Sequence, residues 1–555
     1  NGWSFGKEKT KNGRGLLLGN PHYPAIGALK FYQMHLTIPG EYNVNGATLY
    51  GYPLVLIGFN ENLAWTHTVA SSRHFTVYKL KLKRDDPLSY RYDKQYKKIQ
   101  ENKFTVPVLS EDGSVKSVPR SIFFSHYGPI LEAKDLAEWT EKSAYTIRDA
   151  NEGIYQMIDQ WLEMGRSKNF TQFKKVLQTH RGNPWANTLY ADKEGNTYYA
   201  DVSTVPKLSK STLFHWRTNI MAQIVWNLAG VHLLDGSKSR DEWIGLISGE
   251  EAPQLHRYDY VSNHNDSPWL TNLNDKSRYF SPLYGKRVTA QSMRTRMGLK
   301  MLEELFAEKD VSPEGVKRKL FSQRSFLAEL VKDDLVERCS SVKNWKRYLK
   351  EGIEPQDLKE ACSQLKNWNG RYEVDEKGVA IFNEWALLMG GKSKYFRKKF
   401  RRSNPIGRPA KLKAKSLLKK DDLLDFFAEA VKNVNATEQG LGANWGELHY
   451  LSKGQSRWPI GGGPTVAGVF NMFSADLSLM GPRVRFDTDL PSHEKVISEK
   501  SYLSDQGYVI ATGSSFIFLV DWDKNGRPNA EGILSYSQSS DSRSPHFDDQ
   551  TELFA

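Results

Sequence analysis

Cysteine is scarce in this chain, and long hydrophobic runs are missing from it. Only Cys339 and Cys362 occur among its 555 residues, which are too few for a disulfide scaffold or a cysteine-based zinc site. They are either two buried thiols or one bridge. No run approaches the roughly 18 apolar residues that a membrane-spanning helix needs. A mean hydropathy of −0.58 with 12% aromatic residues describes a globular protein rather than a disordered one.

Several common catalytic motifs are also missing. The chain contains no HExxH, no paired CxxC and no GxSxG, which argues against a metalloprotease or an α/β-hydrolase. The glycine run 461–463 is not followed by the GKS or GKT of a phosphate-binding loop. We interpret this run as a place where two stretches of backbone approach closely.

The positive charge is concentrated in one stretch. The net charge is +13, and thirteen Lys or Arg residues with no Asp or Glu lie in 391–420, so the rest of the chain is neutral. Such a stretch is a candidate for contact with an anionic surface, either nucleic acid or lipid head groups. We favour the alternative that it is a solvated insertion, or a surface that packs on an acidic α-chain. We expect it to lie away from the residues that carry chemistry.

The first two dozen residues predict a strand hairpin. Trp3 and Phe5 alternate with polar neighbours, as in a half-buried strand. The dipeptide 12–13 is Asn-Gly, which favours a tight hairpin turn because both positions must accept positive φ. The leucine run 16–18 predicts a strand that is buried on both faces.

This hairpin would return His22 to the start of the chain. Pro21 and Pro24 hold the backbone stiff on either side of that histidine. The chain begins with Asn1 rather than Met, and we interpret its start as the product of processing. A titratable ring is therefore expected beside a free α-amino group.

The period of the apolar residues divides the chain into three parts. Residues 1–290 are mainly strands, although 143–177 reads as helical, and 446–555 return to strands. Between them, 291–445 form a helical block that includes the basic stretch 391–420. The predicted helices of the block are 292–306, 326–339, 357–368, 380–389 and 421–434.

Sequence motifs along the whole chain resemble one family. They are LLLGNPHYP, FYQMHLTIPG, IGFNENLAWTHTV, HYGPI, SNHNDSPWLTN and SYSQSSDSRSPHFDDQTELF. In this order they resemble the β-chain of the penicillin acylase family, and most closely its acyl-homoserine-lactone and aculeacin-type branch. The resemblance implies an α+β fold, the αββα sandwich of N-terminal-nucleophile hydrolases, with the helical block inserted. In such enzymes the hydroxyl or thiol of the first residue attacks an amide and its own α-amine acts as the base.

One departure from the family concerns the nucleophile. The family's β-chain begins with Ser followed by Asn, whereas Asn1 stands first here and offers no nucleophile. We expect the nucleophilic Ser immediately before Asn1, with Ser4 as a distant fallback because it carries no α-amine. The non-enzyme alternative is a binding protein that kept the fold and lost its nucleophile.

The resemblance also implies the other catalytic groups and the acyl pocket. His22 would contact the amine and hydroxyl of the nucleophile. The backbone N–H of Val69 and the side chain of Asn265 would form the oxyanion hole, and Arg294 would brace Asn265 and the terminal amine. The implied substrate-binding lining is Tyr23, Leu49, Tyr52, Leu56, Ile57, Trp161, Trp185 and Ala186.

The function implied is removal of a fatty acyl chain from an amide, most directly an N-acyl-homoserine lactone. The alternatives are a lipopeptide or siderophore-precursor acylase and a β-lactam acylase. The expected partner is an α-chain cut from the same precursor, in the periplasm or outside the cell, where a Cys339–Cys362 disulfide would form. No nucleic acid partner and no cofactor are expected. Residues 70–73, Ala-Ser-Ser-Arg, lack the carboxylates of penicillin acylase's calcium site, so no metal is expected there.

Overall fold

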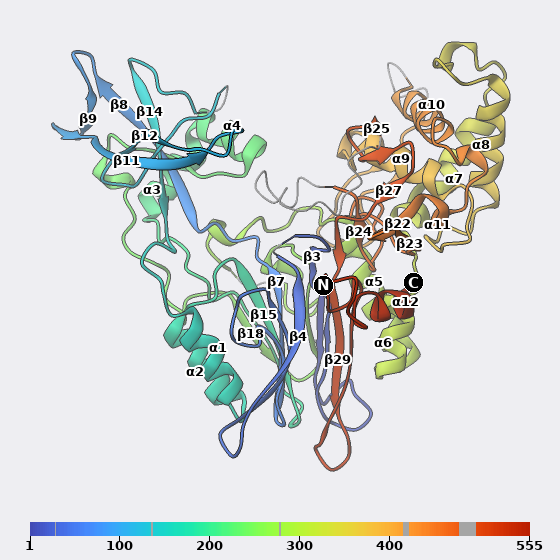
Figure 1. Cartoon of the computed structure of the whole chain (residues 1–555), viewed down its shortest axis with the longest axis horizontal. Helices are drawn as coiled ribbons and strands as arrows, with labels where there is room; N and C mark the ends of the chain where they lie inside the picture. The colour runs from blue at the N-terminus through green and yellow to red at the C-terminus, as the bar shows by residue number, and fades with distance from the viewer. Residues whose placement is uncertain (28, 135–136, 277–278, 415–420, 477–494) are drawn as a thin grey trace.

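The computed structural model describes residues 1–27, 29–134, 137–276, 279–414, 421–476 and 495–555. Two antiparallel sheets lie face to face at its centre (Figure 1). The larger sheet contains, in spatial order, β18 (Gln254–Arg257), β16 (Thr197–Ala200), β15 (Ala186–Asp192), β7 (Leu63–Val69), β6 (Ile57–Phe59), β5 (Tyr42–Leu49) and β4 (Phe31–Ile38). The smaller sheet contains β19 (Tyr260–Asn263), β1 (Gly2–Phe5), β2 (Leu16–Gly19), β29 (Phe516–Trp522) and β30 (Pro528–Leu534).

Glycines allow the two sheets to approach closely. A Cβ atom at Gly2 would lie 3.1 Å from the side chain of Leu189 in β15. One at Gly19 would lie 2.8 Å from the hydroxyl of Thr66 in β7. The missing side chains therefore bring the end of β1 close to the end of β7, where the candidate site is found.

Helices cover the outer face of each sheet. Phe173 of α2 (Phe170–His180), next to α1 (Met157–Arg166), packs on Trp65 of the larger sheet with ring centroids 6.1 Å apart. Phe306 of α5 (Met293–Glu308) packs on Phe5 of the smaller sheet at 6.3 Å, and α6 (Pro313–Leu320) lies against β29. The layer order helix, sheet, sheet, helix confirms the predicted αββα fold class.

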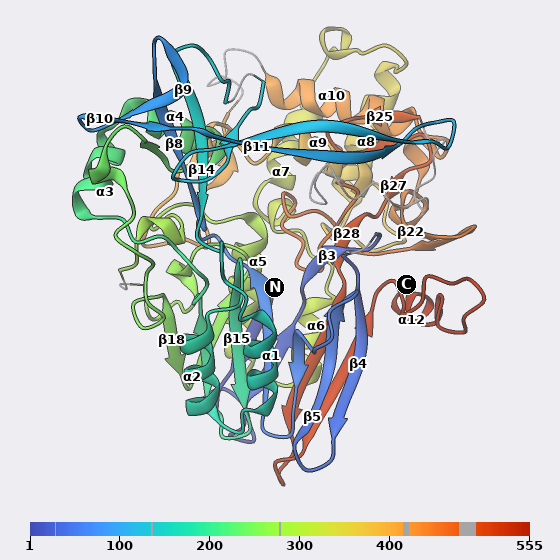
Figure 2. The same ribbon diagram turned by 60° about the vertical axis from the view of Figure 1, so that its left-hand side comes forward.

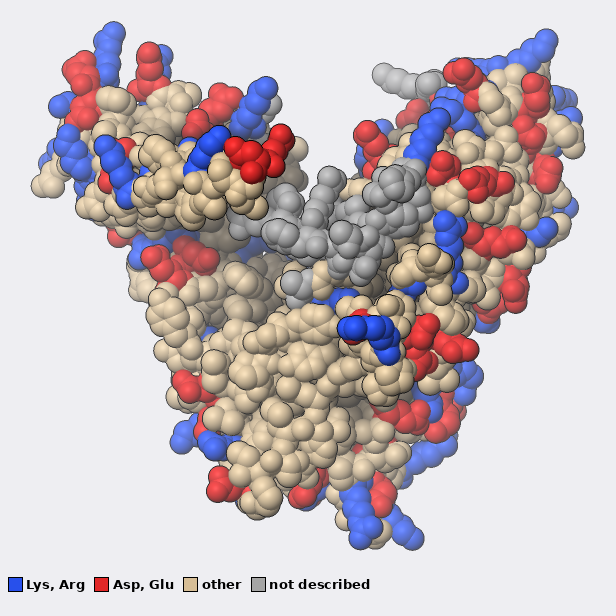
Figure 3. Space-filling model, in the orientation of Figure 1, with Lys and Arg blue, Asp and Glu red and all other residues tan. Residues whose placement is uncertain are grey.

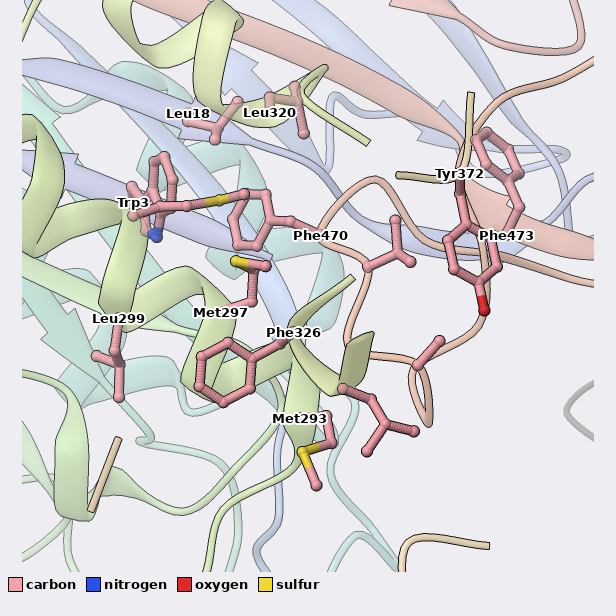
Figure 4. Close-up of a cluster of buried hydrophobic side chains, with 14 of the residues drawn as sticks. Trp3, Leu18, Met293, Met297, Leu299, Leu320, Phe326, Tyr372, Phe470 and Phe473 are labelled. Carbon is pink, nitrogen blue, oxygen red and sulfur yellow. The ribbon is translucent and has the colours of Figure 1, made fainter. Parts of the chain in front are cut away.

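The core beneath α5 joins three distant segments (Figure 4). Trp3 stacks on Phe470 with ring centroids 4.5 Å apart and donates to His264 Nε2 at 2.9 Å. Met297 of α5 belongs to the same cluster. This packing ties strand β1 to α5 and to the C-terminal part of the chain.

Strand β1 differs from its prediction in two respects. It is buried on both faces, not half-buried, because it lies inside the smaller sheet. The hydroxyl of Ser4 donates to Tyr190 O at 2.5 Å and accepts from Thr197, so it is unavailable as the fallback nucleophile. β1 and β2 do form an antiparallel pair, but residues 6–15 connect them as a long loop and Asn12-Gly13 lies inside that loop.

Two arms rise above the sandwich, and the molecular surface is hollowed between them (Figure 3). The first arm corrects the expectation of a helical start at 143, because Ser143–Asp149 is a strand paired with β8. A long hairpin that turns at Asp112-Gly113 extends from this arm (Figure 2). The arm consists of β8 (Phe75–Lys83), β9 (Asp86–Tyr92), β10 (Gln95–Lys98), β11 (Gln100–Leu109), β12 (Val115–Phe124), β13 (Ile130–Leu131), β14 (Ser143–Asp149), β17 (Leu233–Asp235), α3 (Lys210–Thr218) and α4 (Ile220–Ala229).

The second arm contains most of the helices predicted in 291–445, whereas α5 and α6 cover the smaller sheet. A disulfide joins Cys339 on α7 to Cys362 on α8, with their Cα atoms 6.0 Å apart. The arm contains α7 (Phe326–Ser340), α8 (Pro355–Asn367), α9 (Val379–Met389) and α10 (Asp422–Asn435).

The basic stretch is not a detached insertion. Its described part folds as a short hairpin of β20 (Phe396–Lys398) and β21 (Ala410–Leu412), while 415–420 lie outside the described residues. Buried Arg296 donates to Ile406 O at 2.6 Å and to Pro409 O at 2.8 Å. The hairpin is therefore anchored to α5, the helix that also carries Arg294, while the expectation that it lies away from the residues that carry chemistry stays a prediction.

The C-terminal part returns to the core and fixes His22. Strand β3 (His22–Pro24) pairs with β28 (Thr512–Ser514), with His22 opposite Ser514. Within the described ranges, no helix combines the length and apolar character needed to cross a bilayer. The remaining elements are α11 (Trp445–Leu448), β22 (His449–Lys453), β23 (Ser456–Pro459), β24 (Phe473–Ser474), β25 (Val496–Ser498), β26 (Leu503–Ser504), β27 (Tyr508–Val509) and α12 (Asp549–Phe554).

Candidate active site

A cavity of about 330 Å³ opens beside Asn1, at the ends of β7 and β15 and against α1. Most of its wall is apolar, and polar groups gather at the end where Asn1, His22 and Asn265 lie. All of the predicted lining residues except one are in this wall: Tyr23, Leu49, Leu56, Ile57, Trp161, Trp185 and Ala186.

Tyr52 is the exception. It lies behind Trp161, with the two rings edge to face at 6.2 Å, and it does not line the cavity. Its buried hydroxyl has no hydrogen-bond partner among the described residues, and burial raises its pKa. Tyr52 therefore supports the tryptophan and does not belong to the substrate-binding lining.

Some of the lining was not predicted from the sequence, notably Phe31, His67, Met157 and Asn183. His67 follows Trp65 at the strand period of two, which was the available signal that it faces α1. Its ring lies edge to face with Trp161 at 5.3 Å. Burial lowers the pKa of His67 to about 4, so this ring is a neutral wall residue at neutral pH.

The start of β1 is held by a dense set of hydrogen bonds. The α-amine of Asn1 donates to Asn20 O at 2.6 Å, and its side-chain Nδ2 donates to Phe470 O at 2.8 Å. The same Nδ2 lies 3.4 Å from His22 Nε2. In contrast, the buried Nδ1 of His22 has no partner in the described part of the chain.

Arg294 joins the start of β1 to Asn265. Its Nη1 donates to Asn1 Oδ1 at 2.5 Å, and its Nη2 donates to Asn265 Oδ1 at 2.8 Å. Its Nε donates to Thr465 Oγ1 at 3.1 Å. The planar guanidinium thus uses its donors to fix two amide side chains in one orientation.

Asn265 is presented by a constrained backbone. Its φ of 71° lies in the left-handed region, which Asn tolerates better than most residues. Its N–H donates to Asn263 Oδ1 at 2.9 Å, an atom that also accepts from Thr68 at 2.7 Å. Its side-chain Nδ2 donates to Val69 O at 3.1 Å, which places the amide group beside the end of β7. Asn263 and Thr68 were not predicted from the sequence.

Burial and charge keep the imidazole of this site neutral. Burial, the terminal amine, Arg294 and His264 hold the pKa of His22 well below its usual range. Burial lowers the pKa of Arg294 to about 10, so Arg294 remains charged at neutral pH. A neutral base and a fixed cation therefore lie together at the polar end of an apolar cavity.

This arrangement suits attack on an acyl carbonyl. An apolar chain fits the cavity, and the carbonyl would then lie near Asn265 and Val69. The second hydrogen of the Asn265 amide and the Val69 backbone N–H are the donors available for a developing oxyanion. The predicted groups His22, Val69, Asn265 and Arg294 are therefore brought together, the first three at the cavity and Arg294 behind Asn1 and Asn265.

Comparison with known proteins gives consistent matches. The profile of the penicillin amidase family matches residues 1–555. Acyl-homoserine lactone acylase PvdQ of Pseudomonas fluorescens (strain Pf0-1) is 33% identical over 571 residues, covering 100% of this chain and 67% of the relative. Aculeacin-A acylase of Actinoplanes utahensis is 32% identical over 569 residues with the same coverage. The thermostable penicillin G acylase of Alcaligenes faecalis shares the fold, with a TM-score of 0.61 at 17% identity over 100% of this chain and 94% of that chain.

Proposed function

Because the chain belongs to the penicillin amidase family of amide-hydrolysing enzymes, we propose that it removes the fatty acyl chain from N-acyl-homoserine lactones. The observation that carries the proposal is the apolar cavity that ends at Asn265 and Val69. Each methylene buried there contributes about 0.8 kcal/mol to the binding free energy, so binding of an aliphatic tail is favoured. The name and 33% identity of the PvdQ relative support the homoserine lactone as the amine side of the substrate.

The nucleophile is a serine one residue before Asn1. In the register of β1 and β2, Gly2 lies opposite Gly19, and Asn20 N donates to Asn1 O at 2.9 Å. A preceding residue would continue this register opposite Pro21, next to His22 at the cavity wall. The unpartnered Nδ1 of His22 is then available to that residue.

The reaction follows from these positions. The serine oxygen attacks the amide carbonyl, and its own α-amine takes the hydroxyl proton. Asn265 and the Val69 N–H stabilise the oxyanion, while His22 and Arg294 hold the attacking residue and the donor in place. The proton passes to the leaving nitrogen, homoserine lactone departs, and water hydrolyses the acyl ester to the free fatty acid.

The enzyme works with a companion chain in an oxidising compartment. The chain spans about two thirds of the length of the relatives named above, and we assign the remainder to an α-chain cut from the same precursor. The Cys339–Cys362 disulfide fits the periplasm or the exterior. The α-chain would also complete the mouth of the cavity.

The test is product analysis. The protein with its serine in place should release homoserine lactone and free fatty acid from acyl-homoserine lactones, as measured by mass spectrometry. An intact acyl amide, or a product in which only the lactone ring has opened, would contradict the proposal. The 32% identical aculeacin-A acylase supports lipopeptide deacylation as the second candidate. A lipopeptide should therefore be assayed as a substrate in parallel, together with a phenylacetyl amide that tests for a β-lactam acylase.

A further inference from the structure

Four polar side chains are buried between the two sheets, next to the candidate active site. Asn187 on β15 lies opposite Thr68 on β7, so their side chains are on the same face of the larger sheet. Tyr199 on β16 joins them, and Asn263 reaches in from β19 of the smaller sheet, where it lies opposite Gly2. None of the four is more than 4% exposed. Polar groups are costly to bury unless they form hydrogen bonds, so the contacts of this inter-sheet cluster show what it holds in place.

The hydrogen bonds of the inter-sheet cluster converge on the Asn187 side chain. Its Nδ2 lies 3.1 Å from Thr68 Oγ1, 3.3 Å from Thr68 O and 3.3 Å from Asn263 Oδ1. Its Oδ1 accepts from the Tyr199 hydroxyl at 2.7 Å. A donor on the oxygen fixes which end of the amide is the nitrogen. The Asn187 amide therefore directs its two hydrogens towards Thr68 and Asn263.

One of these contacts reaches the first proposed oxyanion donor. Thr68 O and the Val69 N–H belong to the same peptide unit, which is planar and trans, so the carbonyl and the N–H point in opposite directions. Asn187 Nδ2, at 3.3 Å from Thr68 O, therefore helps to hold the plane of this peptide and with it the direction of the Val69 N–H. A hydrogen bond to the carbonyl oxygen also polarises the peptide and makes its N–H a stronger donor.

The same side chain reaches the second proposed donor through Asn263. Asn263 Oδ1 accepts from the Asn187 amide, and it also accepts from the Thr68 hydroxyl at 2.7 Å. The third group on this oxygen is the backbone N–H of Asn265, at 2.9 Å. This last contact holds the left-handed backbone that presents the Asn265 amide. The segments that carry the two donors are thus joined through one buried asparagine.

We propose that Asn187 is a positioning residue that sets the relative geometry of the two oxyanion donors, and that Tyr199 fixes the orientation of its amide. The inference rests on the amide hydrolysis proposed above. Ala186 and Thr68 line the cavity, whereas Asn187, among the described residues, lies behind that wall. The oxyanion forms only in the transition state. Loss of the Asn187 contacts should therefore lower kcat and leave KM nearly unchanged.

Two neighbouring tyrosines on β16 provide a matched pair of variants. Tyr199 and Tyr198 are each 1% exposed, and each donates to a side-chain amide oxygen, at 2.7 Å to Asn187 and at 2.6 Å to Gln254. They face opposite sides of the sheet, and Tyr198 packs against Phe170 of α2 with ring centroids 5.1 Å apart.

Tyr199→Phe should lower kcat about three- to tenfold at constant KM, because the Asn187 amide loses the contact that orients it. Tyr198→Phe should leave kcat unchanged. Both variants should lower the melting temperature to a similar extent, since each loses one buried hydrogen bond. Equal kcat values for the two variants would overturn the inference, as would a change of KM alone in Tyr199→Phe.

Asn187→Leu tests the residue itself, and it should lower kcat roughly 10- to 100-fold. An alkylboronic acid with the chain length of the best substrate separates this effect from general damage. The nucleophilic serine oxygen adds to boron while its proton passes to the α-amine, and the tetrahedral adduct places an oxygen between the two donors. Its affinity should fall by the same factor as kcat, whereas the affinity for the primary alcohol of equal length should stay unchanged.

The outcomes distinguish this inference from the proposed function. An active wild type with an unchanged kcat in Asn187→Leu would overturn the inference alone. Equal weakening of the boronic acid and the alcohol would also overturn it, because the substitution would then have disturbed the whole acyl cavity. A wild type that releases no fatty acid from any acyl amide would overturn the proposed function, and the inference with it. If Asn187→Leu does not fold, the tyrosine pair decides.

Discussion

Arg294 Nη2 donates to the side-chain oxygen of Asn265 at 2.8 Å, and this contact determines which way the Asn265 amide faces. With its oxygen held by the guanidinium, the amide must direct its N–H group towards Val69 and the cavity. The other arm of the guanidinium holds Asn1 Oδ1 at 2.5 Å. One buried cation therefore orients both the Asn1 side chain and the Asn265 amide.

Asn265→Ala should lower kcat by roughly 10²–10³ and leave the fold intact. The loss removes one of two donors aimed at the oxyanion, while the Val69 backbone N–H remains. The variant must be compared as a fully processed enzyme, because the same donor could assist precursor cleavage. Steady-state kinetics that give a near-normal kcat would remove Asn265 from the mechanism.

Trp185→Ala should shift the preference of the enzyme towards longer or bulkier acyl chains. The indole lines the cavity, is 51% exposed, and is held by a backbone with φ of 54°. Removing it widens the wall, and each added methylene that finds room should raise kcat/KM about fourfold. Trp139→Ala, in the first arm against Phe123, is the control. An unchanged chain-length profile would show that the indole does not limit the acyl site.

Removing the exposed charges of the basic hairpin and removing the buried arginine that holds it in place should have different effects. Arg397, Lys398, Arg401 and Arg402 are exposed, and within the described residues none of them forms an ion pair. Replacing all four by Gln should leave turnover of a soluble substrate unchanged. Arg296→Met should destabilise the protein by about 1–3 kcal/mol, since it leaves two carbonyls without their donor.

The measurements for this hairpin are turnover and thermal unfolding of both variants. A fall in turnover for the fourfold Gln variant, with no change in its melting temperature, would tie the exposed charges to catalysis. An unaffected Arg296→Met variant would show that the hairpin is held by other contacts.

His232→Phe should reduce the acid sensitivity of the fold. Burial, and to a smaller extent Arg73, lower the pKa of His232 to about 3. Below about pH 6.5 His232 binds a proton in the unfolded chain but not in the folded protein. The free energy of unfolding therefore falls as pH falls from about 6.5 to 3. Replacing the ring by Phe should flatten the slope of unfolding free energy against pH by about 1.4 kcal/mol per unit in this window. Urea titrations at several pH values would measure it, and an unchanged slope would contradict the assignment.

Local patterns were enough to predict most of the architecture. The helical block was predicted because its apolar residues repeat at 3.6, and the resemblance supplied the sandwich. The prediction that β1 is half-buried was wrong because a serine in an alternating pattern indicates a solvent-facing position. In the fold, Tyr190 and Thr197 form hydrogen bonds with the Ser4 hydroxyl between the two sheets. Such partners are distant in the chain and invisible to periodicity.

The site was predicted unevenly for the same reason. His22 and Asn265 stand in the family motifs, and Arg294 was aligned with the family's arginine. Asn263 and Thr68, which hold Asn265 in place, lie in the same motifs, but nothing local shows that their side chains point towards Asn265. The basic stretch looked peripheral because charge suggests solvent, and only the fold reveals that Arg296 anchors it. Helices α3 and α4 were not predicted, since exposed as well as buried positions of α4 are apolar and no clear helical stripe results.

Trapping the acyl-enzyme identifies the nucleophile itself. The native protein would be mixed with an excess of N-acyl-homoserine lactone, quenched in acid within one turnover, and digested for peptide mass mapping. We expect one acyl group, carried as an ester on a serine immediately before Asn1, in the peptide that runs into β1. A turnover-competent preparation that carries no acyl group there, or carries it at another residue, would contradict it.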